Sequence, residues 1–298
     1  MSEDKEVSRR KFLKLCGLTS AAAAIGIASS TSKVSAASSD QVPGAAQYSF
    51  LFDSSKCVNC RACVIACKRW NNLNGDVSQT EPADLASNTW NVVNTTKSSA
   101  GATIYVKEQC LHCLEPACVF GCPTGALKKY DQGQVVIDPE RCIGCRNCLM
   151  VCPFQIPKFD DVVGVSRKCW MCYNRSNIGL PTACVESCPH DALDYGTRAE
   201  MVSEAEARAT AINGYVFGET EAGGTNVLYV SQAPLGELTW QSPAQNVNRF
   251  ANVSNSSYPT LVVNMVKSVL EVGVVVAAVA AAALLFISRR KTSKAQET

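Results

Sequence analysis

The stretch CIGCRNCLMVCP, residues 142–153, holds the pattern that decides the fold. Its four cysteines have the spacing C-x2-C-x2-C-x3-C and are followed by a proline. Three other compact groups of four cysteines lie in the 298-residue chain, and the four groups hold sixteen of its seventeen cysteines. The groups are Cys57, Cys60, Cys63 and Cys67; Cys110, Cys113, Cys118 and Cys122; Cys142, Cys145, Cys148 and Cys152; and Cys169, Cys172, Cys184 and Cys188.

This spacing is typical of cysteines that bind 4Fe–4S clusters. Zinc sites also use C-x2-C pairs, but usually as two separated pairs or together with histidines. The chain has only His112 and His190. Disulfides fit poorly, because cysteines so close together cannot all find separate partners without strain. The sequence therefore predicts four 4Fe–4S clusters and a protein that moves electrons, with a structural zinc-binding scaffold as the alternative.

The residues beside the cysteines support an iron–sulfur interpretation. Pro123, Pro153 and Pro189 follow the last cysteine of three groups, where proline ends a short helical turn. Gly144 lies between Cys142 and Cys145 and lets backbone N–H groups approach the sulfur atoms. Such hydrogen bonds tune the reduction potential of a cluster.

The first 36 residues are typical of a twin-arginine signal peptide. Arg9 and Arg10 precede an uncharged Ala- and Gly-rich stretch from Leu15 to Ser32, and small residues follow. Cleavage after Ala36 or its neighbour would remove Cys16, the one cysteine outside the four groups. The twin-arginine route carries folded proteins, so clusters could be inserted in the reducing cytoplasm before export.

Near the other end, residues 272–287 read VGVVVAAVAAAALLFI and contain no charged residue. Together with the apolar residues upstream they predict one transmembrane helix over 261–288. The basic cluster that follows should stay in the cytoplasm by the positive-inside rule, so residues 289–298 form a cytoplasmic tail. The cluster domain is then expected on the periplasmic face of the cytoplasmic membrane.

The net charge of +2 depends on these terminal segments. Residues 37–260 carry 17 Lys and Arg against 21 Asp and Glu, a formal charge of −4, so no nucleic-acid partner is expected. Seven basic residues lie beside the cysteine groups and should offset the negative charge of thiolates and clusters. They are Lys56, Arg61, Lys68, Arg69, Arg141, Arg146 and Lys168.

Local patterns predict several elements between the groups. Residues 71–106 look like a polar loop ending in an extended Gly101–Val106, and Lys128–Asp138 like a turn followed by a strand. Thr197 and Glu200 form a capping box for a helix reaching about Ala211. Two strands are expected at 215–218 and 227–230, and a linker at 236–260.

Longer segments carry a family resemblance over about residues 50–235. They are CVNCRACVIAC, CLHCLEPACVFGCPTGAL, CIGCRNCLMVCPFQIPK, CWMCYNRSNIGLPTACVESCPHDAL, YGTRAEM and FGETEAGGTNVLYV. The chain resembles the four-cluster ferredoxin-like subunits of membrane-bound periplasmic oxidoreductases, including formate dehydrogenases, dimethyl sulfoxide reductase and the hydrogenase-2 type.

The resemblance implies which cysteines share a cluster. The four implied ligand sets are Cys57, Cys60, Cys63 and Cys188; Cys67, Cys169, Cys172 and Cys184; Cys110, Cys113, Cys118 and Cys152; and Cys122, Cys142, Cys145 and Cys148. The implied fold is α+β, with one dicluster module over 107–159 inserted into an outer module over 48–106 and 160–235, plus the C-terminal transmembrane helix. His112 is expected as an N–H donor near a sulfur or as a proton-coupled tuning group, and Trp170 and Met171 as shields against water.

The resemblance also implies two kinds of partner. One is a catalytic subunit, a nickel–iron hydrogenase or a molybdopterin or tungstopterin enzyme, and the other an integral membrane subunit that reacts with quinone or holds cytochrome b. The sequence contains no P-loop, dinucleotide fingerprint or nucleophile with a paired base. We therefore expect an electron-transfer subunit rather than a stand-alone redox enzyme, with hydrogenase favoured because that type has both a signal and a C-terminal helix.

Overall fold

The computed structural model describes residues 47–73, 84–240, 249–251, 253–256 and 273. Its largest sheet has the strand order β8-β1-β10-β9, formed by Leu193–Thr197, Tyr48–Asp53, Val227–Ser231 and Tyr215–Phe217. β1 runs parallel to β10 and antiparallel to β8. Segments from the two ends of the cysteine-bearing region therefore meet in one sheet.

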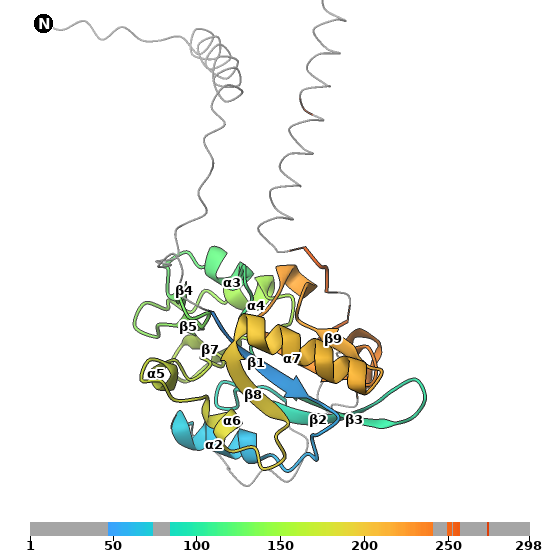
Figure 1. Ribbon diagram of the computed structural model, residues 1–298. Helices are drawn as coiled ribbons and strands as arrows, with labels where there is room; N and C mark the ends of the chain where they lie inside the picture. Colours follow the sequence, from blue (N-terminus) through green and yellow to red (C-terminus); the bar gives the residue numbers. More distant parts are fainter. Residues whose placement is uncertain (1–46, 74–83, 241–248, 252, 257–272, 274–298) are drawn as a thin grey trace, which may run out of the picture. The chain divides into compact units, whose positions relative to one another are not determined.

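The two faces of this sheet have different neighbours. Helix α7, Arg198–Ala211, covers one face and buries Ala205 and Ala209 against Leu51 and Leu228 (Figure 1). Phe50 and Phe52 point to the other face, because successive strand residues alternate, and join the largest buried cluster together with several cysteines. The cysteine-bearing loops thus pack against the face of the sheet that α7 leaves free.

A second sheet has the order β11-β2-β3, formed by Thr239–Trp240, Val92–Lys97 and Thr103–Glu108. Strands β2 and β3 form a long hairpin that projects to one side (Figure 1). Two further short hairpins lie in the described part of the chain: β4 Leu127–Lys129 with β5 Val135–Ile137, and β6 Lys158–Asp160 with β7 Val165–Arg167.

The short helices pair across the sequence. Helix α2, Ala62–Trp70, packs against α6, Ala183–Glu186, while α3, Ala117–Phe120, packs against α4, Asn147–Val151. The pair α2–α6 lies at the opposite end of the described fold from α3–α4 (Figure 1). Helix α5, Tyr173–Ser176, and the 3₁₀ turns η2, Glu221–Gly223, and η3, Leu235–Glu237, are further helical elements of the described fold.

Several local predictions are confirmed. Thr197 and Glu200 form the capping box of α7, and β9 and β10 lie where two strands were expected. The polar-loop prediction for 71–106 is wrong over Val92–Lys97, because these residues pair with β3 and bury their apolar side chains. The segment Lys128–Asp138, predicted as a turn followed by one strand, belongs to a hairpin formed by two strands, β4 and β5.

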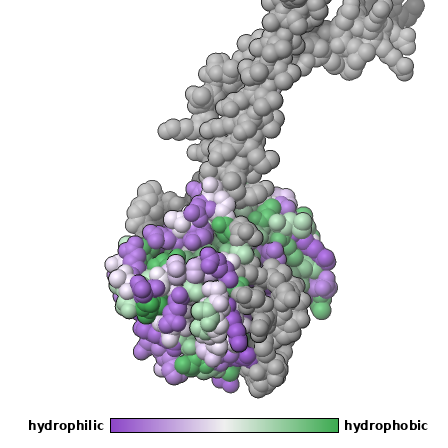
Figure 2. Space-filling view, turned by 90° about the vertical axis from the view of Figure 1, so that its right-hand side faces the viewer, coloured by the Kyte–Doolittle hydropathy of each residue, from purple (hydrophilic) through white to green (hydrophobic). Residues whose placement is uncertain are grey.

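Other predictions concern residues outside the described part. The signal peptide over 1–36 lies there, as does the transmembrane helix over 261–288 apart from Gly273. No helix among the described residues is long and apolar enough to cross a membrane. Part of the stretch predicted as a linker joins the fold, since β11 pairs with β2 and Phe250 is buried among aromatic rings. The face in Figure 2 mixes hydrophilic and hydrophobic residues.

Candidate iron–sulfur sites

Three separate cavities are each lined by four cysteines. We name them site I, site II and site IV. The same donor set in each suits the same kind of occupant. The cysteines are Cys57, Cys60, Cys63 and Cys188 in site I; Cys67, Cys169, Cys172 and Cys184 in site II; and Cys122, Cys142, Cys145 and Cys148 in site IV.

The four remaining described cysteines form site III. The thiol of Cys113 interacts electrostatically with those of Cys152, Cys118 and Cys110. Each of the four sites thus holds the cysteines that the family resemblance implies for one cluster, including those far apart in sequence. None of the sixteen described cysteines forms a disulfide. No three cysteine, histidine or acidic side chains in this part of the chain are grouped tightly enough for a single metal ion.

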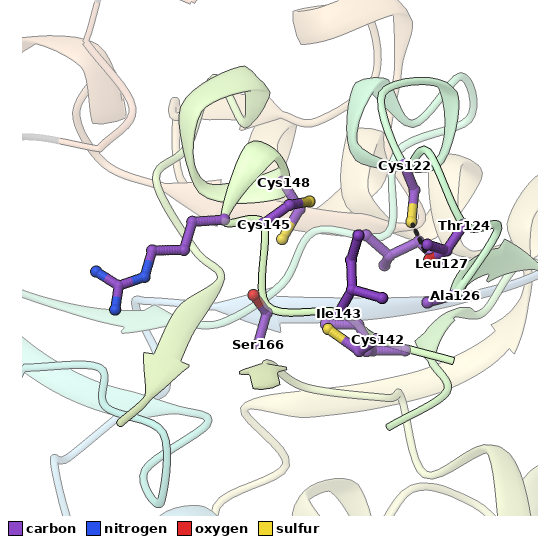
Figure 3. Close-up of a pocket in the computed structure, with 11 residues that line it drawn as sticks. Cys122, Thr124, Ala126, Leu127, Cys142, Ile143, Cys145, Cys148 and Ser166 are labelled. Carbon is purple, nitrogen blue, oxygen red and sulfur yellow. Dashed lines mark hydrogen bonds between the residues drawn. The ribbon is translucent and has the colours of Figure 1, made fainter. Parts of the chain in front are cut away.

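Site IV shows how the chain builds such a site. Its four thiols surround one space, contributed by the loop after α3, the loop before α4 and α4 itself (Figure 3). Thr124 lies 3.7 Å from the sulfur of Cys122, and Ser166 of β7 lines the edge. The sulfur atoms therefore face hydroxyl groups as well as one another.

Left-handed backbone conformations let the C-x2-C loops curl around each site. Asn59, His112, Gly144 and Met171 each lie between the first two cysteines of a group and have φ between 49° and 69°. Only glycine fits at position 144 for a second reason: a Cβ atom there would lie 2.5 Å from the carbonyl oxygen of Gly164. Successive N–H groups in such turns form a concave surface that suits an anion, as the sequence predicted for Gly144.

Burial keeps most of the thiols protonated when no iron is bound. It raises the pKa of Cys63 and Cys172 to about 12, and that of Cys152 and Cys169 to about 11. Cys122 differs, because its pKa lies below the ordinary value. Burial raises this pKa, but hydrogen bonds from Leu127, Thr124 and Ala126 lower it by more. Because iron binds thiolates, cluster insertion must release protons from these groups.

Two buried N–H groups at site II lack a hydrogen-bond acceptor, and this bears on whether a cluster fits there. The Nε1 of Trp170 and the Nε2 of His112 are buried without a hydrogen-bond partner in the described chain, and both residues line the site II cavity. The Nδ1 of His112 accepts a hydrogen bond from the N–H of Val135 at 2.8 Å, so its proton lies on Nε2. Buried donors usually have partners, and the sulfides of a 4Fe–4S cluster would supply acceptors here.

The structure bears on the two roles expected for His112. Burial, followed by the nearby ammonium groups of Lys168 and Lys129, holds the pKa of His112 well below its ordinary value of 6.5. The imidazole is therefore neutral at physiological pH, which favours a fixed N–H donor over a proton-coupled group. Trp170 and Met171 line site II, where they were expected, and His190 is exposed beside site I.

Buried ammonium groups lie near three of the sites. Lys107 is fully buried and interacts with thiols of sites I and II. Lys168 interacts with Cys118 and Cys152 of site III, and Lys129 interacts with Cys113. Of these only Lys168 was anticipated, because its place beside Cys169 is visible in the sequence, whereas Lys107 and Lys129 reach their sites through the folding of β3 and β4.

Electrostatic neighbours give the order of the sites. Cys63 of site I interacts with Cys184 of site II, and Cys169 of site II interacts with Cys110 of site III. Cys118 of site III in turn interacts with a site IV thiol, that of Cys148. Neighbouring sites therefore follow one another in the order I to IV. Helices α2 and α6 carry thiols of sites I and II, and helices α3 and α4 carry thiols of sites III and IV.

Known iron–sulfur proteins are similar to much of this chain. Residues 102–198 match a family described as a 4Fe-4S dicluster domain. The chain is 35% identical over 200 residues to the iron-sulfur subunit of the nitrate-inducible formate dehydrogenase of Escherichia coli K12, covering 62% of this chain and 68% of that one. It belongs to this family of iron–sulfur subunits.

Two other family members come from different complexes. The B subunit of the anaerobic dimethyl sulfoxide reductase of E. coli K12 is 40% identical over 155 residues, covering 52% of this chain and 76% of its own. The hydrogenase-2 operon protein HybA of E. coli O157:H7 is 32% identical over 280 residues, covering 78% and 83%. The chain is therefore an electron-transfer subunit of an oxidoreductase that binds 4Fe–4S clusters, and is not the catalytic subunit.

Proposed function

We propose that the chain holds four 4Fe–4S clusters, one in each of sites I to IV, and passes electrons along them in that order. The observation that carries this proposal is the series of four groups of four thiols. Each group has the ligand number of a cubane cluster, and the inner dicluster module over 107–159 would contribute sites III and IV.

The exposure of the thiols supports an entry point at one end and an exit at the other. Among the described cysteines only Cys60 of site I and Cys145 of site IV are exposed. The ligands of sites II and III are buried or partly buried. Electrons would therefore enter or leave at sites I and IV, while the two middle clusters stay shielded from water.

The course of the chain favours site IV as the end that faces the membrane. Ala222 of η2 donates a hydrogen bond to the carbonyl oxygen of Ser254 at 2.7 Å, and Thr225 bridges to Cys113 of site III. Residues 253–256 accordingly lie at the α3–α4 end (Figure 1). A transmembrane helix over 261–288 would begin a few residues further on.

Exposed apolar side chains surround the same end. Phe120 of α3, Met150 of α4, Ile143, and Val162 and Val163 of the β6–β7 turn are all more than half exposed. Ile143 also lines the site IV cavity. We infer that this surface docks on an integral membrane subunit that reacts with quinone, and that site I faces the catalytic subunit.

The extensive match to the hydrogenase-2 operon protein favours a hydrogenase as the catalytic partner. Formate dehydrogenase or another molybdopterin enzyme is the alternative, since relatives belong to those complexes too. The twin-arginine signal over 1–36 would place the cluster domain in the periplasm, anchored to the cytoplasmic membrane with the C-terminal tail inside.

Metal content and directional electron transfer test the proposal. The complex, purified anaerobically, should contain about sixteen iron atoms and as many sulfides in this subunit, and its large subunit would identify the substrate. Cys60→Ala should block cluster reduction from the substrate side, and Cys145→Ala should block reduction from quinol. About eight iron atoms, stoichiometric zinc, or the opposite directional effects would refute the proposal.

A further inference from the structure

Lys107 is a buried cation without a carboxylate partner. It lies in β3, its side chain is 0% exposed, and no ion pair among the described residues includes it. The adjacent carboxylate of Glu108 is held by Arg249 at 2.7 Å and by Asn94 at 2.6 Å. An unpaired ammonium in an apolar core is costly, so its charge needs another source of compensation.

The neighbours of the ammonium group place it beside site II. Lys107 donates a hydrogen bond to Oε1 of Gln109, and its Nζ lies 5.3 Å from the centre of the Phe50 ring. Both Gln109 and Phe50 line the site II cavity. Phe52, two residues further along the same face of β1, lines the site I cavity.

The thiols that interact with Lys107 belong to both sites. Those in site II are Cys184, Cys169 and Cys67, and those in site I are Cys63 and Cys57. Burial lowers the pKa of Lys107, but negative charge on these sulfurs outweighs burial and raises it. Lys107 is therefore positively charged when the sulfurs are thiolates, the form in which cysteines bind a metal centre.

We propose that Lys107 is a shared tuning charge that raises the reduction potentials of the clusters in sites I and II together. This inference rests on the proposed function, because it requires clusters in those sites. A reduced cluster carries one more negative charge than an oxidised one, and a fixed positive charge nearby favours the reduced form. At an effective dielectric of about 20, a unit charge about 10 Å away changes such an equilibrium roughly tenfold or more.

Lys129 provides a matched comparison. It is also a buried lysine, it donates a hydrogen bond to the carbonyl oxygen of Leu114, and the thiol it interacts with is Cys113 of site III. Its neutralisation should affect a different cluster from those that Lys107 affects. The two variants together distinguish local tuning from a general loss of structure.

The experiment is a redox titration of the complete complex, followed by electron paramagnetic resonance, with iron content measured on each sample. In Lys107→Met the equilibrium constant for reduction should fall about tenfold for two of the four clusters. This corresponds to a fall of about 59 mV in each of their midpoint potentials for one electron. Lys107→Arg should restore them, and Lys129→Met should shift a different cluster. Lys107→Gln is a second neutral variant in case the methionine variant folds poorly.

Iron content separates the possible failures. Fewer than four clusters in the wild-type subunit would refute the proposed function instead of the role of Lys107. Unchanged midpoints in a neutral variant with full iron content would overturn the tuning role, as would equal shifts in all four clusters. Loss of clusters in both neutral variants would also overturn it, because Lys107 would then serve cluster retention and not potential.

Discussion

Replacing Arg249 by methionine should strongly destabilise the fold. The guanidinium is 3% exposed and binds Glu108 at 2.7 Å and Asp84 at 2.6 Å. It also donates a hydrogen bond to the carbonyl oxygen of Gln155 at 3.1 Å. Removing one member of a buried ion pair leaves an uncompensated charge, which costs about 3–5 kcal/mol. We therefore expect Arg249→Met to lose about that much free energy of unfolding at pH 7.

The loss should depend on pH. Burial raises the pKa of Glu108 above its ordinary value of 4.5, although Arg249 and Asn94 lower it in part. The folded state thus binds more protons than the unfolded state above pH 4.5, and stability falls as the pH rises through the folded pKa. Without Arg249 the folded pKa rises further. The cost of Arg249→Met should therefore be smaller at pH 5 than at pH 7.5.

Unfolding of the cluster-loaded protein in denaturant, under argon, provides the assay. Release of clusters makes unfolding irreversible, so the measured quantity is the rate of bleaching of cluster absorbance. It should rise by up to about two to four orders of magnitude at pH 7, the limit reached when the whole loss appears in the unfolding rate. Glu108→Gln in the Arg249→Met background should recover part of the loss, because both buried charges are then gone.

A partly exposed ion pair supplies the control. Glu204 of α7 pairs with Arg208 at 2.7 Å; the Glu204 side chain is 46% exposed, and Arg208 also pairs with Asp194, so it keeps a partner when Glu204 is neutralised. Glu204→Gln should cost less than about 1 kcal/mol. An Arg249→Met protein that unfolds no faster than this control, or equally fast at pH 5 and 7.5, would refute the assignment of Arg249 as a buried counter-charge.

Three further predictions concern the sites and the anchor. Gly144→Ala should remove the site IV cluster, because a Cβ there meets the oxygen of Gly164, whereas Gly179→Ala, at a similar φ with open space around it, should keep full iron content. Iron chelation should expose the thiols of sites I and IV to alkylating reagents before those of II and III, as mass spectrometry would show, because Cys60 and Cys145 are exposed. Deleting residues 261–298 should release a subunit that retains its clusters and is reduced by its catalytic partner but no longer reduces quinone; full quinone activity without membrane association would contradict the anchor.

The sequence was most informative where chemistry depends on local spacing. The cysteine groups, the Gly144 turn and the capping box at Thr197 are short-range patterns, and the last two appear as expected. Strand β2 was missed because its Asn and Thr residues resemble a loop until β3 pairs with it.

Long-range contacts were beyond sequence reasoning. Arg249 and Glu108 are 141 residues apart, and nothing near either one indicates the pair. The charge of Lys107 is likewise meaningful only after β1 and β3 bring Phe50 and Gln109 around it. Such contacts form through tertiary packing, which local patterns do not encode.

The cavities of sites I and II draw their thiols from both ends of the region, whereas sites III and IV use residues 110–152 alone. During synthesis, all four thiols of site III and all four of site IV emerge from the ribosome before Cys169, the second of the four thiols of site II. Iron delivery could therefore begin with the inner pair, while sites I and II wait for Cys188 and Cys184. Sites I and II would then be completed only after the whole cysteine-bearing domain has been synthesised and folded.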